Sequence, residues 1–196
     1  MNNPLFLFVG RSASGKTTIA NLLGEKYGYK QVESYTTRPP RYDGEIGHLF
    51  VSKAEFDELP ELAAYTLYNG NEYGTTFEQL SQCDIYVIDP PGVETLLENY
   101  EKINRPIRII YFDSTVTTRI DRMLDRGDSD NAIVGRLHHD ESSDWLGTLK
   151  DIVYYYGSIV HKNVKLYVVD ASQNIDEVFD NILNYIDKGD KNGSDD

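Results

Sequence analysis

The sequence predicts an α/β fold in which helices flank a parallel sheet. Three observations lead to this class. Short unbroken apolar runs recur along the chain, segments with helical periodicity separate them, and a glycine-rich loop joins the first run to the first helical segment. Strands of a parallel sheet are buried on both faces, so they read as continuous apolar runs. Because ligands of such sheets bind at the carboxyl ends of the strands, we expect a site in the loops there.

Length and composition indicate one domain with a polar tail. The 196 residues suffice for one well-buried core but not for two large ones. We expect a single domain over residues 1–187. Residues 188–196 consist of Lys, Gly, Asp, Asn and Ser, which can bury little, so we expect a disordered tail there.

Charge and hydropathy exclude several kinds of partner. The formal net charge of −13 repels a phosphate backbone, so we expect no nucleic acid partner and only local clusters of Lys and Arg as anion sites. No apolar run is long enough to cross a bilayer, and we expect a cytoplasmic protein without membrane association. The single cysteine, Cys83, excludes an intrachain disulfide and is expected to be small packing material, partly or fully buried. Composition does not predict the oligomeric state.

A phosphate-binding loop is predicted after the first apolar run. Gly10, Gly15, Lys16 and Thr17 fit the spacing G-x-x-x-x-G-K-[ST]. In such a loop backbone amides point at phosphate oxygens, the lysine reaches the β- and γ-phosphates, and the threonine hydroxyl binds Mg²⁺. Glycine permits close backbone approach, and the start of the following helix adds partial positive charge. The residues expected to contact ATP are Gly10, Ser12, Ala13, Ser14, Gly15, Lys16, Thr17 and Thr18.

The segments beside this loop support a site rather than a simple turn. Residues 5–9 predict a buried strand, and residues 17–26 predict a helix that ends near Gly28. A glycine-containing turn between core elements is the alternative. The order of strand, loop and helix favours a sheet of the P-loop NTPase type.

A second anion site is predicted in the segment that follows the first helix. Arg38 and Arg41 flank a Pro-Pro pair, which stiffens the loop. Two guanidinium groups placed in this way can bind one anion at low entropic cost, and arginine binds phosphate in a bidentate manner. Two solvated surface arginines are the alternative.

A carboxylate and a polar flap complete the candidate site. Residues 85–88 predict a strand followed by Asp89, whose carboxylate can face phosphates, a metal or an acceptor, or can simply lie at a turn. Residues 126–136 are polar and contain two glycines, as a closing flap requires. Closure would bring Arg126 and Arg136 onto a transferring phosphoryl group. A surface ion pair between Arg126 and a nearby aspartate is the alternative.

The remaining segments predict the scaffold. Strands are expected over residues 107–112 and 165–169, and helices over residues 115–125 and 175–186, the latter capped by Asn174. In the helix over residues 115–125, Arg119 and Arg122 lie on one face.

One titratable cluster and one aromatic cluster are expected to have no role in ligand binding. Adjacent histidines on a helix diverge, so we expect solvent exposure rather than metal binding for His138, His139 and Asp140. We expect Trp145, Ile152, Val153 and residues 154–156 to pack a helix against the core.

Several segments resemble those of guanylate kinases. Ser34-Tyr-Thr-Thr-Arg-Pro-Pro-Arg41, followed by Gly44-Glu-Ile-Gly-His-Leu-Phe-Val-Ser52, is similar to that family's Ser-x-Thr-Thr-Arg-x-Pro-Arg and Gly-x-x-Tyr-x-Phe-Val-Ser. Asn69-Gly-Asn-Glu-Tyr-Gly-Thr75 resembles its Gly-Asn-x-Tyr-Gly-Thr/Ser element, and Ile88-Asp-Pro-Pro-Gly92 occupies the place of its Ile-Asp-x-Gln-Gly turn. Arg122-Met-Leu-Asp-Arg-Gly127 and the later Arg136-Leu137 resemble its lid.

The resemblance implies ATP-dependent transfer of a γ-phosphoryl group to a nucleoside monophosphate, GMP or dGMP, with Mg²⁺ as cofactor. It also implies an acceptor-binding insert at about residues 34–82 and a lid at about residues 126–145. The implied catalytic residues are Lys16, Arg126 and Arg136, and the implied metal-binding residues are Thr17 and Asp89. The residues implied to bind the acceptor are Ser34, Arg38, Arg41, Tyr73, Thr75 and Asp89.

The chain departs from the family's motifs at several positions, three of which bear directly on the acceptor and the metal. Ala64 stands where the family has a glutamate that accepts hydrogen bonds from guanine, His48 replaces a tyrosine of the acceptor-phosphate cluster, and Val87 replaces an aspartate. Because a hydrogen-bonding pocket discriminates strongly between bases, the acceptor can differ. The alternatives are a related kinase for another (deoxy)nucleoside monophosphate or a phosphorylated sugar, and a non-catalytic guanylate-kinase-like binding module. The intact glycine-rich loop favours an enzyme.

Overall fold

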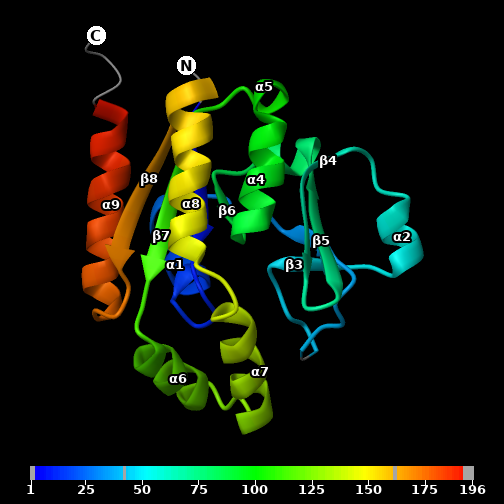
Figure 1. Cartoon of the computed structure of the whole chain (residues 1–196), viewed down its shortest axis with the longest axis vertical. Coiled ribbons are helices and arrows are strands. Elements are labelled where there is room, and N and C mark those ends of the chain that lie inside the picture. Colours follow the sequence, from blue (N-terminus) through cyan, green and yellow to red (C-terminus); the bar gives the residue numbers. More distant parts are fainter. Residues whose placement is uncertain (1–2, 42, 161–162, 192–196) are drawn as a thin grey trace.

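A four-stranded parallel sheet forms the centre of the protein, whose computed structural model describes residues 3–41, 43–160 and 163–191. The strand order is β6-β1-β7-β8, and each neighbouring pair is parallel. The strands are β1 (Leu5–Val9), β6 (Ile85–Val87), β7 (Ile107–Asp113) and β8 (Val164–Asp170). Each apolar run thus forms a strand within one residue of the expected bounds. The predicted α/β fold is confirmed (Figure 1).

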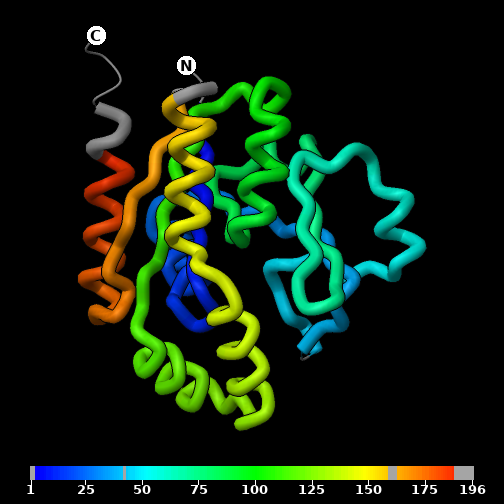
Figure 2. The backbone as a smooth tube through the Cα atoms, in the orientation of Figure 1, coloured from blue at the N-terminus to red at the C-terminus, as the bar shows by residue number. Residues whose placement is uncertain are grey.

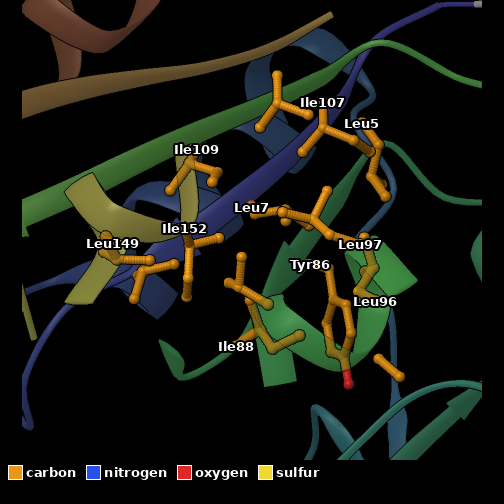
Figure 3. Close-up of a cluster of buried hydrophobic side chains, with 14 of the residues drawn as sticks. Leu5, Leu7, Tyr86, Ile88, Leu96, Leu97, Ile107, Ile109, Leu149 and Ile152 are labelled. Atoms are coloured by element: carbon orange, nitrogen blue, oxygen red, sulfur yellow. The ribbon is translucent and has the colours of Figure 1, made fainter. Parts of the chain in front are cut away.

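Helices cover both faces of this sheet (Figure 1). On one face lie α1 (Lys16–Tyr27) and α9 (Ile175–Lys191), and on the other lie α4 (Pro90–Glu98) and α8 (Trp145–Val153). The short α5 (Tyr100–Ile103) follows α4. Successive side chains of a strand point to opposite faces, so Leu5 and Leu7 pack with α4 and α8, whereas Phe6 and Phe8 pack with α1 and α9. Figure 3 shows the first of these layers.

Residues 34–82 leave the central sheet and form a second, mixed sheet with the order β3-β2-β5-β4. Its elements are β2 (Ser34–Thr36), β3 (His48–Phe50), α2 (Lys53–Asp57), β4 (Leu62–Tyr68), β5 (Asn71–Thr76) and α3 (Phe77–Ser81). Asn69 and Gly70 connect β4 to β5 with positive φ angles of 48° and 74°, the backbone of a tight hairpin turn. Ser52 and Thr76 start the two helices with reciprocal capping boxes. The second sheet is therefore fixed at its turns and helix ends.

Two helices lie beyond the carboxyl end of β7. Ser and Thr side chains cap both: Thr115 precedes α6 (Val116–Asp125), and Ser129 precedes α7 (Asp130–Asp140). Gly127, with a φ angle of 82°, lies in the turn between them. Figures 1 and 2 show this pair extending from the end of the sheet at which the glycine-rich loop also lies.

The structure corrects two expectations about the carboxyl-terminal part. Trp145 and Ile152 are buried as predicted, but Tyr154 and Tyr155 are exposed, because α8 ends at Val153 and the chain continues as a wider π-helix, η1 (Tyr154–Val160). Helix α9 begins at the Asn174 cap as predicted, yet it continues to Lys191 instead of ending before residue 188. An established helix extends through polar residues at little cost. Residues 192–196 of the expected tail lie outside the described residues.

Across the described ranges, every helix is too short or too polar to span a bilayer. The amphipathic helices instead direct their apolar residues to the central sheet. Cys83 is half-buried, as predicted.

Candidate active site

The glycine-rich loop, residues 10–15, follows β1 and leads directly into α1. A Cβ atom at Gly10 would lie 2.8 Å from the Phe112 carbonyl oxygen of β7, so a larger residue does not fit. Gly15 caps α1 with a φ angle of 96°, a conformation that favours glycine. Ala13 has a φ angle of 61°, which costs about 1 to 2 kcal/mol for a residue with a side chain. The loop is thus a tight, strained turn at a helix N-terminus, where backbone amides bind anions.

Lys16 folds back over this loop. Its Nζ donates to the carbonyl oxygens of Gly10 and Arg11, the latter at 2.9 Å, and to the Ser14 hydroxyl at 3.2 Å. Burial lowers the pKa of Lys16 to about 8, although the carboxylate of Asp140 acts in the opposite direction. The loop therefore holds a positive charge where a phosphate tail would need one.

Arg38 and Arg41 converge on the carboxylate of Glu45. Arg38 donates to both carboxylate oxygens, at 2.9 and 3.2 Å. The Arg41 amide donates to Oε2 at 2.6 Å, and the Arg41 Nη1 lies 3.5 Å from Oε1. Burial raises the pKa of Glu45, but the hydrogen bonds from Arg38 and the Arg41 amide outweigh it, so the pKa is below its ordinary value. The stiff loop thus brings two guanidinium groups to one anion.

A cavity of about 250 Å³ connects the loop, the second sheet and helix α7. The predicted site residues that line it are Gly10, Ser12, Ala13, Lys16, Thr17, Ser34, Arg41, Tyr73, Asp89, Arg126 and Arg136. Arg38 lines a neighbouring cavity together with Arg41, Tyr73 and Arg136. The structure therefore gathers candidate donor, acceptor and lid residues around one space.

Other predicted site residues do not line this cavity. Thr75 is fully buried, and its hydroxyl donates to Gln79 Oε1 at 3.1 Å. Ser14 is buried beneath the loop, where its hydroxyl accepts from Lys16. Gly15 is half-buried, and Thr18 is exposed on the first turn of α1. Of these residues, Thr75 fits its implied role least well, because its buried hydroxyl already donates to Gln79, a residue of the capping box of α3.

Arg126 and Arg136 meet at Asp128. The Arg126 Nε donates to Asp128 Oδ1 at 2.9 Å, and the Arg136 Nε lies 3.6 Å from Asp128 Oδ2. Hydrogen bonds from Arg126 hold the pKa of Asp128 below its ordinary value. Arg126 thus forms the ion pair expected of a surface arginine, yet both arginines also line the cavity.

Asp89 caps α4 with its side chain. Its Oδ1 accepts from the Gly92 amide and its Oδ2 accepts from the Thr66 hydroxyl, each at 2.9 Å. Burial raises the pKa of Asp89. Each carboxylate oxygen accepts one hydrogen bond and keeps a second lone pair, so Asp89 can serve a metal ion directly or through a bridging water.

The metal ligands available near the loop are few. Within the described ranges, no group of three or more His, Cys, Asp or Glu side chains could hold a metal ion. Nucleotide-bound Mg²⁺ keeps several waters and takes one or two protein ligands besides phosphate oxygens. The exposed Thr17 hydroxyl at the loop therefore fits Mg²⁺ without a protein cage.

His48 on β3 lies in the wall of the same cavity. Its Nδ1 is 3.0 Å from the Ser34 Oγ, and its ring meets the Tyr73 ring edge-on, with centroids 5.6 Å apart. Burial, together with the positive charge of Arg38, lowers the pKa of His48 to about 4. His48 is therefore neutral at pH 7 and adds no charge to the arginine pair.

Acidification is expected to destabilise the protein partly through His48. Its pKa is about 4 when folded and near 6.5 when unfolded, so between these values the unfolded state binds more protons and stability falls as the pH falls. For this one group the loss between pH 7 and pH 5 is about 2 kcal/mol. Urea unfolding at both pH values, with wild type and His48→Gln, measures it. An equal loss in both proteins would contradict the expectation.

Sequence reasoning missed Asp140, which is fully buried rather than exposed. Its Oδ2 accepts from the Ser12 amide at 2.7 Å and lies 3.2 Å from the Arg119 Nη1. The expected exposure holds for His138 but is wrong for Asp140, because the buried Arg119 provides the partner that lets a carboxylate leave water.

Glu45 was missed as well. Its carboxylate holds both Arg38 and Arg41. A signal was available, because Glu45 follows Arg41 by four residues. No comparable local signal marks Asp140, whose partner Arg119 lies 21 residues away.

Comparisons with known proteins bear on this site. No family model matches the chain. The guanylate kinase of Neisseria gonorrhoeae is 41% identical over 101 residues, 48% of this chain and 46% of that protein. The guanylate kinase of Geobacter metallireducens is 33% identical over 110 residues, 50% of this chain and 54% of that protein. The chain thus spans about half the length of these curated relatives.

A second kind of relative matches at lower identity but over nearly the whole chain. The human UMP-CMP kinase is 25% identical over 202 residues, 94% of this chain and 98% of that protein. Both kinds of relative are nucleoside monophosphate kinases by name. The chain is therefore similar to guanylate kinases, as its motifs predict, and more broadly to nucleoside monophosphate kinases.

Proposed function

We propose that the chain is an ATP-dependent nucleoside monophosphate kinase that converts GMP or dGMP and ATP into GDP or dGDP and ADP. One observation carries the proposal: a loop with Lys16, an arginine on the second sheet and the lid arginines border one cavity. A triphosphate tail and a monophosphate can approach each other in such a space, and phosphoryl transfer needs alignment more than covalent chemistry. The similarity to guanylate kinases supports the same reaction.

On the donor side, the chain aligns phosphates and neutralises their charge. Lys16 and the loop amides hold the β- and γ-phosphates of ATP. Arg126 and Arg136, which Asp128 holds beside the cavity, stabilise the charge on the transferring phosphoryl group. When bound, Mg²⁺ supplies further neutralisation, and Thr17 and Asp89 would hold it, directly or through water.

The acceptor belongs to the second sheet in this proposal. Residues 34–82 form the acceptor-binding insert, in which Arg38, Arg41 and Tyr73 hold the acceptor phosphate. Ser34 and Asp89, which line the same cavity, would contact the nucleoside. Thr75 contacts the base only if its hydroxyl leaves Gln79. Residues 126–145 form the lid that excludes water, so that the phosphoryl group is not lost to hydrolysis.

A coupled ADP-release assay across the common ribo- and deoxyribonucleoside monophosphates tests the proposal. We expect turnover with GMP or dGMP that depends on ATP and Mg²⁺. If GMP and dGMP are inert while another acceptor turns over, the choice of acceptor is wrong. If ATP is consumed with no acceptor, or not consumed at all, the kinase proposal itself fails.

Replacing Arg41 by Ala is expected to raise the KM for the acceptor by roughly 10- to 100-fold, because a charge-assisted hydrogen bond to phosphate is lost. The KM for ATP is expected to change less than about twofold, since Lys16 holds the donor. Arg41→Lys is expected to recover only part of the loss, because a lysine cannot make the bidentate contact. Lys53→Ala, which removes an exposed ion pair on α2, is the control. A donor KM that rises with the acceptor KM would contradict the assignment.

A different acceptor is the second candidate, and the pocket chemistry favours it at one point. Ala64 is buried and carries no hydrogen-bonding group, whereas the buried Tyr86 places its hydroxyl near Ser34 and lines the cavity. Figure 3 shows this hydroxyl pointing away from the labelled aliphatic side chains. Burial raises the pKa of Tyr86, so the group is a neutral hydroxyl that can both donate and accept. The similarity to UMP-CMP kinase supports the same candidate.

Tyr86→Phe tests which acceptor the pocket fits. Loss of a hydrogen bond to the base is expected to raise the KM of the true acceptor about tenfold, with kcat and the KM for ATP unchanged. The same acceptor series is measured with the variant. If no acceptor KM changes, Tyr86 does not contact the base.

A further inference from the structure

A buried ion pair lies where the glycine-rich loop meets the lid, and the roles proposed above do not use it. Arg119 on α6 and Asp140 on α7 are both fully buried. The Arg119 Nη1 lies 3.2 Å from the Asp140 Oδ2. Figure 1 shows that these two helices form the lower end of the molecule, beside the loop that follows β1.

Asp140 also contacts two other elements. Its Oδ2 accepts a hydrogen bond from the Ser12 amide of the loop at 2.7 Å. Its Oδ1 accepts one from the Tyr68 hydroxyl of β4 at 3.3 Å, and the neighbouring His139 ring lies against the Tyr68 ring, with centroids 4.0 Å apart. One carboxylate therefore connects the glycine-rich loop, the lid and the second sheet.

Glu141 makes a second connection beside the first. It pairs with Arg119 and with Arg11 of the loop, where the distance from Arg11 Nη1 to Glu141 Oε2 is 3.1 Å. Arg11 also donates to the Ser143 carbonyl oxygen at 3.2 Å. Glu141 is half-exposed, however, and its contacts reach the loop through the Arg11 side chain rather than the backbone.

Stability alone does not explain the buried pair. Desolvation of two charges usually cancels their attraction, and apolar residues of similar size often stabilise a core as well or better. Within the described residues, the Arg119 Nε has no hydrogen-bond partner, which adds a further cost. What the pair does provide is a fixed position for the residues around it.

The fixed position of Asp140 affects both Arg136 on α7 and the glycine-rich loop. Arg136 precedes Asp140 by four residues on α7, so the two side chains share one face of the helix. A helix tied to the loop at Asp140 therefore presents Arg136 to the cavity. On the other side of the bond, Ser12 precedes Ala13, whose positive φ angle needs support from its surroundings.

We propose that Asp140 is a positioning residue of the donor site, which fixes the glycine-rich loop against the lid helix. The inference rests on the proposed function, because it takes the loop to be the ATP site. The charged and titratable groups around Asp140 are Arg119 on α6, Glu141 after α7, Arg11 in the loop and Tyr68 on β4.

The test compares Asp140→Asn with Glu141→Gln. Each substitution removes one carboxylate partner of Arg119, but only Asp140 contacts the backbone of the loop. We expect Asp140→Asn to weaken ATP binding, measured by calorimetry, at least tenfold and to lower kcat at least tenfold. We expect Glu141→Gln to change either quantity less than threefold. The KM for the acceptor is expected to change less than threefold in Asp140→Asn, because the Ser12 amide that loses its partner belongs to the donor loop.

A double variant separates positioning from stability. Arg119→Leu with Asp140→Leu removes both buried charges, so its thermal stability is expected to equal or exceed that of Asp140→Asn while its ATP affinity stays low. The inference is overturned if the double variant regains wild-type affinity, or if Asp140→Asn binds ATP within twofold of wild type. A wild-type chain that binds no ATP would instead overturn the proposed function.

Discussion

Replacement of Lys16 by Ala is expected to lower kcat for phosphoryl transfer by roughly 10³-fold, because the loop loses the charge that stabilises the donor phosphates. Acceptor affinity is expected to stay within about twofold, since Arg38 and Arg41 lie in the loop between β2 and β3. Among the described residues, neither arginine is a hydrogen-bond partner of Lys16. The coupled ADP-release assay measures kcat, and calorimetric titration with GMP measures acceptor binding.

Lys26→Ala is the matched control for this variant. Lys26 lies at the other end of α1, is exposed, and places its ammonium 4.6 Å from the Phe179 ring centroid. The Lys26→Ala substitution removes the same charge from the same helix but leaves the charge at the cavity. We therefore expect kcat to stay within about twofold of wild type. Unchanged phosphorylation by Lys16→Ala would show that the donor does not bind at the glycine-rich loop.

Replacement of Arg119 by Met is expected to destabilise the protein by about 3 to 5 kcal/mol, because the fully buried Asp140 carboxylate loses its ionic partner. For a chain of this size, such a loss lowers the melting temperature by about 10 °C. Urea unfolding gives the free energy and calorimetry gives the melting temperature. At this position a methionine keeps most of the side-chain volume, so the effect reports the charge rather than a cavity.

Arg122→Met, one turn further along α6, is the control. Arg122 donates only long hydrogen bonds, at 3.4 and 3.3 Å, to the carbonyl oxygens of Ala13 and Gln173. Its replacement is expected to cost less than about 1 kcal/mol. Equal losses from the two variants would mean that Asp140 does not depend on Arg119.

Local patterns account for the parts of the site that could be predicted. The strand, loop and helix around Lys16 are consecutive in the chain, so spacing and periodicity suffice to place them. The Pro-Pro pair between Arg38 and Arg41 likewise fixes the local chain and brings both arginines to one carboxylate. In each case the residues that decide the geometry lie within a few positions of one another.

The parts that could not be predicted depend on distant contacts. Asp140 follows two histidines on a helix with few apolar residues, a pattern that indicates a solvated face. Only the packing of α6 against α7 and the loop decides that Asp140 is buried. Thr75 and Asp89 show the same limit in another way, because their positions were predictable but their hydrogen bonds to Gln79 and Gly92 were not.

Because the carboxylate of Glu45 already pairs with Arg38 and Arg41, an anionic ligand must compete with it for the two guanidinium groups. A singly charged ligand such as acetate carries the same charge as the Glu45 carboxylate and therefore has no electrostatic advantage over it. A phosphate monoester gains its second charge near pH 6, so its advantage over the resident carboxylate grows as the pH rises through that value. The pocket would thereby select ligands by the charge of their anionic group, independently of any contact with a base.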